Sequence, residues 1–206
     1  MNRKTRMLAH GALLAALYVA LTYLQNFLIP GSATWAIQFR VSEALCVLAL
    51  FTPAAISGLS IGCLLFNLSY SAALPLDFLV GTLATVLACS CMYFARKVTF
   101  RKLPVLSLLM PAVFNSLLVG WELAVYIGGG FWLNAFYVAV GEAAVLMTLG
   151  TALYYALKKA ENIQNISDKV VTLYELNGVY NYFYTDMPYS TGSITQYDIV
   201  YLGRNR

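Results

Sequence analysis

Long apolar runs fill most of the chain between residues 7 and 158 and restrict what it can fold into. Most of these runs are close to the ~20 residues that a helix needs to cross the hydrocarbon of a bilayer. The composition agrees, because 60% of the residues are hydrophobic and only 11% are charged. Soluble domains, in contrast, have about 25% charged residues. The sequence therefore predicts an all-α membrane protein built as one helix bundle.

Six apolar segments can be separated in this region, and the second is only about half a span long. Pro30 ends the first segment, Pro53 ends the second, and a glycine run at 128–130 separates the last two. The basic start is typical of a signal peptide, but the apolar run is too long for a signal core, so we expect it to be retained. Residues 1–160 are thus predicted to form a six-transmembrane-helix bundle, with segments at 7–29, 42–51, 54–70, 76–95, 103–127 and 131–157.

Basic residues predict which side of the membrane each end of the bundle faces. They precede the first segment, lie between the fourth and fifth, and follow the sixth, and the positive-inside rule assigns such positions to the cytoplasm. We expect a multi-pass protein of the cell membrane with both termini cytoplasmic and outer loops at residues 30–41, 71–75 and 128–130. This topology, and not nucleic-acid binding, explains the net charge of +4. The basic residues concerned are Arg3, Lys4, Arg6, Arg96, Lys97, Arg101, Lys102, Lys158 and Lys159.

Acidic residues show the opposite asymmetry. The chain has only four before residue 160, namely Glu43, Asp77, Glu122 and Glu142. On the predicted topology the first three lie at or near outer helix ends, and Glu142 lies about three helical turns into the last segment. Arg40 comes three residues before Glu43, and charge at the mouth of a hydrocarbon-embedded helix is costly unless it faces protein, water or a ligand. We therefore expect these five residues to line an outward-facing binding site.

Helical spacing adds further polar residues to this expected site. One face of the fifth segment carries Asn115, Glu122 and Tyr126, and one face of the sixth carries Asn134 and Glu142. An anionic site with an aromatic rim suits a planar ligand with hydrogen-bond donors or a positive amine. The alternatives are that the polar groups only bond between helices and that the aromatic residues only anchor the bundle at the membrane interface. The other candidates for the site are Trp35, Gln38, Phe39, Asn67 and Trp121.

Small residues recur along the first segment. Ala12, Ala16 and Ala20 are spaced by four, and Gly11 and Ala15 lie beside them. Such a surface lets another helix approach closely. The other helix could belong to a partner protein or to the same bundle, because Gly58 and Gly62 form a similar small pair in the third segment. The spacing alone does not decide between these two uses.

These features together resemble the QueT family of energy-coupling factor (ECF) transporters. The resemblance covers residues 1 to about 160 and is carried by the basic start, the alanine-striped first segment, QFRVSEAL at 38–45, and a short second segment ending in FTP. Members resembling this chain are S components, which are substrate-binding subunits that capture a queuosine precursor such as 7-aminomethyl-7-deazaguanine or queuine. The resemblance implies docking through Ala12, Ala16 and Ala20 onto a transmembrane coupling protein with two cytoplasmic ATPases, and a ligand region that includes Arg40 and Glu43.

Other functional classes are less well supported by the residues. The chain has no P-loop sequence, so any ATP is expected to be used by partner subunits. His10 is the one histidine and lies far from the acidic residues, and the cysteines fall inside apolar segments, so we expect no metal, no cofactor and no enzyme. The alternatives are a stand-alone proton-coupled transporter, an S component for another ring compound, and, least favoured, an intramembrane carboxylate enzyme.

The C-terminal stretch, residues 161–206, differs from the rest in composition. It is polar and rich in tyrosine, and Asn177 and Gly178 lie between two β-prone runs. Asn-Gly in this setting is a strong hairpin signal. We expect a cytoplasmic extension that forms a β hairpin or is disordered, and the family resemblance implies nothing about it.

Overall fold

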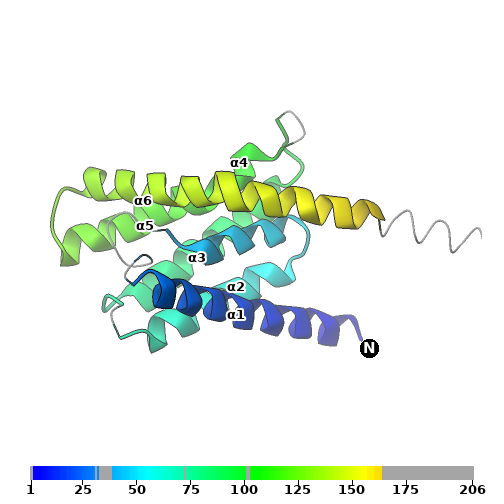
Figure 1. Ribbon diagram of the computed structural model, residues 1–206, viewed down its shortest axis with the longest axis horizontal. Coiled ribbons are helices and arrows are strands. Elements are labelled where there is room, and N and C mark those ends of the chain that lie inside the picture. The colour runs from blue at the N-terminus through cyan, green and yellow to red at the C-terminus, as the bar shows by residue number, and fades with distance from the viewer. Residues whose placement is uncertain (1, 31, 33–38, 72, 101–102, 164–206) are drawn as a thin grey trace, which may run out of the picture. The chain divides into compact units, whose positions relative to one another are not determined.

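The computed structural model describes residues 2–30, 32, 39–71, 73–100 and 103–163. Within these ranges every regular element is a helix, apart from one isolated pairing between Phe100 and Leu103. The chain divides into two compact units, Met1–Leu157 and Lys158–Arg206. The first unit holds the helix bundle (Figure 1). The predicted C-terminal hairpin lies outside the described residues.

Eight helical elements can be named in the described residues up to Gly150. Neighbouring contacts run from α1 to α2, α2 to α3, α3 to α5 and α5 to α6, and the last helix continues through η2 to Ile163. The elements are α1 (Arg3–Leu28), η1 (Val41–Leu50), α2 (Ala54–Ser69), α3 (Asp77–Ala95), α4 (Val105–Leu108), α5 (Met110–Tyr126), α6 (Phe131–Val145) and η2 (Leu146–Gly150).

Four helices in the described residues are long and apolar enough to cross a membrane, namely Lys4–Leu28, Asp77–Ala95, Val105–Tyr126 and Phe131–Ile163. The all-helical membrane class is therefore confirmed, but six complete spans are not. The other two predicted segments are the shorter apolar helices η1, with 10 residues, and α2, with 16. At 1.5 Å per residue α2 extends about 24 Å, less than the ~30 Å of the hydrocarbon layer.

The short helix η1 lies in the middle of the bundle. It contacts α1, α2, α3, α6 and η2, and Figure 1 shows it in light blue between α1 and α6. A helix that is apolar all round is stable when neighbours cover every side, and eight of its ten residues are buried. It is a 3-10 helix, and runs of this length are uncommon. Residues three apart eclipse in such a helix, which stacks Cys46 over Glu43.

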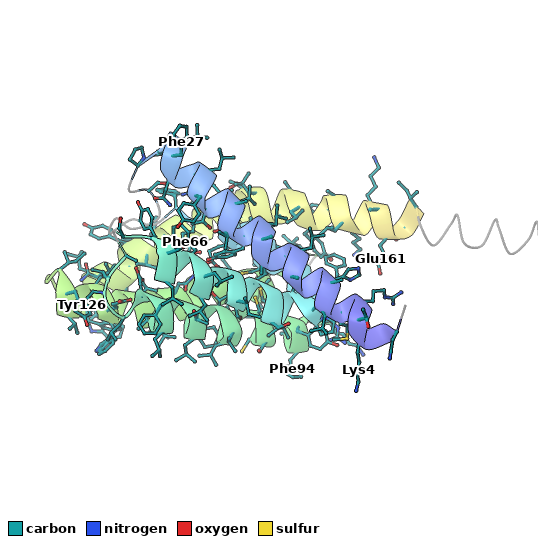
Figure 2. All side chains as sticks on the ribbon, turned by 90° about the horizontal axis from the view of Figure 1, so that it is seen from below. Lys4, Phe27, Phe66, Phe94, Tyr126 and Glu161 are labelled. Carbon is teal, nitrogen blue, oxygen red and sulfur yellow. The ribbon has the colours of Figure 1, made fainter. Side chains whose placement is uncertain are left out.

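Lys4 and Arg96 lie at the same end of the bundle. Figure 2 shows Lys4 and Phe94 at that end, and Phe27 and Tyr126 at the opposite end. Arg96 follows α3 directly at the first end, where its guanidinium lies 3.9 Å from the centre of the Tyr93 ring. This arrangement agrees with the charge asymmetry of the sequence, while the side of the membrane that each end faces stays a prediction.

Glycines set the distance between α1 and α2. A Cβ on Gly58 would lie 2.6 Å from the Gly11 carbonyl oxygen, and a Cβ on Gly62 would lie 2.9 Å from the Ala15 carbonyl oxygen. Both distances are too short for real atoms, so the two backbones touch where these residues are glycine. Close backbone approach through small residues is a typical way for helices to associate in membranes.

At the contact between Gly11 and Gly58, we expect substitution by alanine to change stability in a different way at each of the two glycines. Gly58→Ala should lower stability by about 1–3 kcal/mol, because its Cβ would meet the Gly11 backbone. Gly11→Ala should be neutral or stabilising, because its Cβ would have ordinary contacts of 3.7 Å or more and alanine favours helix. Thermal unfolding of both variants in the same detergent checks this, and equal melting temperatures would contradict the close contact.

Candidate functional site

The structure brings Arg40 and the four carboxylates of the bundle together. All five residues are buried, with no more than 3% of their surface exposed. They come from the start of η1 and from α3, α5 and α6. Glu122 interacts electrostatically with Asp77 and Arg40. Glu142 interacts in the same way with Glu43 and Arg40. The five residues therefore form one buried cluster of ionisable side chains, called the acidic cluster below.

Arg40 and Asp77 form an ion pair within this cluster, with Nη2 of Arg40 3.9 Å from Oδ1 of Asp77. The other Asp77 oxygen, Oδ2, accepts a hydrogen bond from the Leu74 N–H (3.1 Å). Asn67 donates to the Asp77 carbonyl (2.8 Å). A Cβ on Gly81 would lie 2.8 Å from the Asn67 amide nitrogen and 3.7 Å from Nη1 of Arg40, so this glycine makes room for both side chains.

The remaining carboxylates divide into one that is satisfied and two that are not. Oε1 of Glu43 accepts from the Tyr18 hydroxyl (2.6 Å) and Oε2 from the Cys46 thiol (3.2 Å). Both oxygens of Glu122 and both of Glu142 accept no hydrogen bond of normal geometry from the described residues. The nearest polar groups are the Asp77 side chain and the Leu76 backbone beside Glu122, and the Asn115 side chain beside Glu142. Buried polar groups in native structures almost always have a partner, and burying a charged group without one is costly. Glu122 and Glu142 are thus the groups best placed to accept hydrogen bonds from a bound molecule.

The predicted polar residues differ in how they relate to the acidic cluster. Asn115 is buried and lies beside Glu142, and Asn67 is bound to Asp77 as described above. Asn134 is buried as well, but its amide donates to the Gly128 carbonyl (2.9 Å) and so holds the turn between α5 and α6.

The predicted aromatic rim is not buried with the carboxylates. Phe39, Trp121 and Tyr126 are each more than 40% exposed, and Tyr126 lies in the last turn of α5, at the end of the bundle (Figure 2). Exposed aromatic rings at helix ends are typical of membrane-interface anchors. Trp35 and Gln38 lie outside the described residues.

Sequence reasoning missed three polar residues of α1. Tyr18, Thr22 and Gln25 are buried and contact the segment that carries Arg40 and Glu43. The signal was present, because the three residues are spaced i, i+4 and i+7, which is one face of a helix, within an otherwise apolar run. Tyrosine and threonine are common in membrane helices, so this spacing by itself does not distinguish a functional face.

The small residues of α1 lie on two different faces. Gly11 and Ala15 are buried against Gly58 and Gly62 of α2. The alanine stripe Ala12, Ala16 and Ala20 is exposed on the outside of the bundle. The sequence did not decide which small residues pack inside the bundle, and the structure shows that Gly11 and Ala15 do. The alanine stripe is exposed and can contact another molecule.

A family model described as QueT transporter matches residues 8–159. The chain belongs to the QueT transporter family. The match runs from α1 past η2 and so includes every residue of the acidic cluster. No curated protein and no solved structure matches the chain. Within the part of the chain that the structure describes, this QueT protein has no group of three or more histidine, cysteine or acidic residues that could hold a metal ion.

Two substitutions in the QueT acidic cluster should change the stability of the ligand-free protein in opposite directions. Asp77→Ala should lower it by about 3–5 kcal/mol, because the buried Arg40 guanidinium would lose its ion pair with Asp77. Glu142→Leu should raise it by about 1–3 kcal/mol, because a buried carboxylate without a hydrogen bond would be replaced by an apolar group of similar size. Thermal unfolding in detergent measures both effects, and a lower melting temperature for Glu142→Leu would show that this carboxylate stabilises the bundle.

Proposed function

We propose that this chain is the S component of an ECF-type importer and that its acidic cluster captures a queuosine precursor, 7-aminomethyl-7-deazaguanine or queuine, from outside the cell. The observation that carries the proposal is the pair of buried carboxylates, Glu122 and Glu142, whose oxygens accept no hydrogen bond of normal geometry from the described residues. Membership of the QueT transporter family supports transport over catalysis.

The chemistry of a deazaguanine suits these two groups. One carboxylate can accept two parallel hydrogen bonds from the donor edge formed by a ring N–H and the exocyclic amino group. The other can accept from the cationic aminomethyl arm, which also supplies a charge opposite to that of the cluster. Arg40 neutralises only part of the charge, because it is paired with Asp77. Either Glu122 or Glu142 can fill either role.

Release of the ligand would require a partner. We expect the alanine stripe on α1 to dock on a transmembrane coupling protein that is bound to two ATPases, which hydrolyse ATP and topple the S component toward the cytoplasm. The exposure of Ala12, Ala16 and Ala20, together with the use of Gly11 and Ala15 for internal packing, supports this role for the outer face. In this arrangement both termini are cytoplasmic.

The ligand proposal is tested by binding to the purified chain in detergent. Wild-type protein should bind 7-aminomethyl-7-deazaguanine or queuine selectively over guanine and riboflavin in equilibrium measurements. Glu122→Gln should weaken binding about tenfold or more, because it removes a charge-assisted acceptor. Glu161→Gln makes the same change at an exposed position and should leave affinity unaltered. Equal affinities of both variants and wild type would exclude Glu122 from the site, and no binding by wild type would exclude the proposed substrate.

The partner proposal is tested by uptake into cells. Ala16→Trp should abolish uptake and leave ligand binding in detergent intact, because a large side chain on an exposed stripe blocks close approach of another helix. Uptake by the wild type should also require the ATPase subunits. Uptake that persists without them and collapses with a protonophore would instead identify a stand-alone proton-coupled transporter.

A further inference from the structure

Three polar side chains on one face of α1 each form a hydrogen bond with one of the three residues that come after Arg40. The Tyr18 hydroxyl donates to Glu43, and the Thr22 hydroxyl is hydrogen-bonded to the Ser42 hydroxyl (2.8 Å). One turn further along α1, Oε1 of Gln25 accepts from the Val41 N–H (2.7 Å). One face of α1 therefore holds the first three residues of η1.

Gln25 makes three hydrogen bonds through its amide group, and two of them hold the backbone around Arg40. In addition to the bond from Val41, its Nε2 donates to the Phe39 carbonyl and to the Ser32 hydroxyl (2.9 Å). Phe39 also donates its own N–H to the Ser32 carbonyl (2.9 Å). Gln25 is 7% exposed. The amide thus holds the backbone immediately before and immediately after Arg40.

We propose that Gln25 is the positioning residue of the ligand site and acts through Arg40. By holding Phe39 and Val41, it directs the Arg40 side chain into the bundle toward Asp77. Arg40 then neutralises Asp77, so that the carboxylates offered to a ligand are Glu122 and Glu142. This inference rests on the proposed function for its effect on binding, but the position of Arg40 can be measured without a ligand.

The test compares two adjacent amides of α1. Gln25→Leu removes the side-chain hydrogen bonds of Gln25 to Phe39 and Val41 and leaves those of Tyr18 and Thr22 in place. Asn26→Leu is the matched control, since Asn26 is also 7% exposed but bonds to Thr22 of its own helix and to Tyr70. The first measurement is hydrogen exchange at the Arg40 Nε–H by NMR of protein labelled with [15N]arginine, with the signal assigned by Arg40→Lys.

We expect a slowly exchanging Arg40 signal in wild type and in Asn26→Leu, and exchange at least about tenfold faster in Gln25→Leu, because the guanidinium is no longer held in the buried pair. Unchanged exchange in Gln25→Leu, or equal acceleration in both variants, would overturn the proposal. Should Gln25→Leu fail to fold, Gln25→Glu is measured instead, since it keeps the acceptor for the Val41 N–H and replaces the amide donor.

The second measurement is the affinity for 7-aminomethyl-7-deazaguanine. Gln25→Leu should weaken it about tenfold, and should weaken it no further when Asp77→Asn is already present, because both changes act through the same ion pair. Full additivity of the two substitutions would overturn the proposed route through Arg40. If wild type binds no deazaguanine, the proposed substrate fails and the exchange experiment still decides the role of Gln25.

Discussion

Burial of Arg40 and Glu43 at the start of a central helix is the constraint on which the rest of the structure depends. An isolated charge in a water-poor interior is very costly, so neighbouring elements have to supply partners. The first residue of α3 provides Asp77 for Arg40. Helix α1 provides Tyr18 for Glu43. The positions of η1, α1 and α3 relative to one another are therefore linked by charge compensation as well as by apolar packing.

The inner and outer sides of helix α1 make different contacts. Its inner side packs by backbone contact on α2 through Gly11 and Ala15 and holds the Arg40 segment through polar side chains. Its outer side presents the alanine stripe. A rigid helix transmits displacement along its whole length, so a partner bound to the outer side would act on the same element that positions Arg40. The proposed docking surface and the proposed ligand site are thereby connected through one helix.

The two carboxylates of the proposed ligand site are expected to oppose stability. Glu122 and Glu142 are completely buried, and their oxygens accept no hydrogen bond of normal geometry from the described residues. An apolar side chain would be less costly at either position. Natural proteins lose stability mainly where activity needs it, and in the proposed function a bound ligand would supply the hydrogen bonds that these two carboxylates lack. The satisfied carboxylate Glu43, in contrast, contributes to holding η1 in place.

The sequence by itself determined the membrane class, the helical segments and the set of carboxylates, because length, hydropathy and charge are local properties that a bilayer selects directly. It could not show that the short segment at Val41–Leu50 is enclosed by the other helices, or that Gln25 and Thr22 belong with Arg40. It also could not separate Ala16 from Ala15, which differ only in the helix face that they occupy. Those features depend on which helices are neighbours and on hydrogen bonds between residues distant in the chain, so only the tertiary structure decided them.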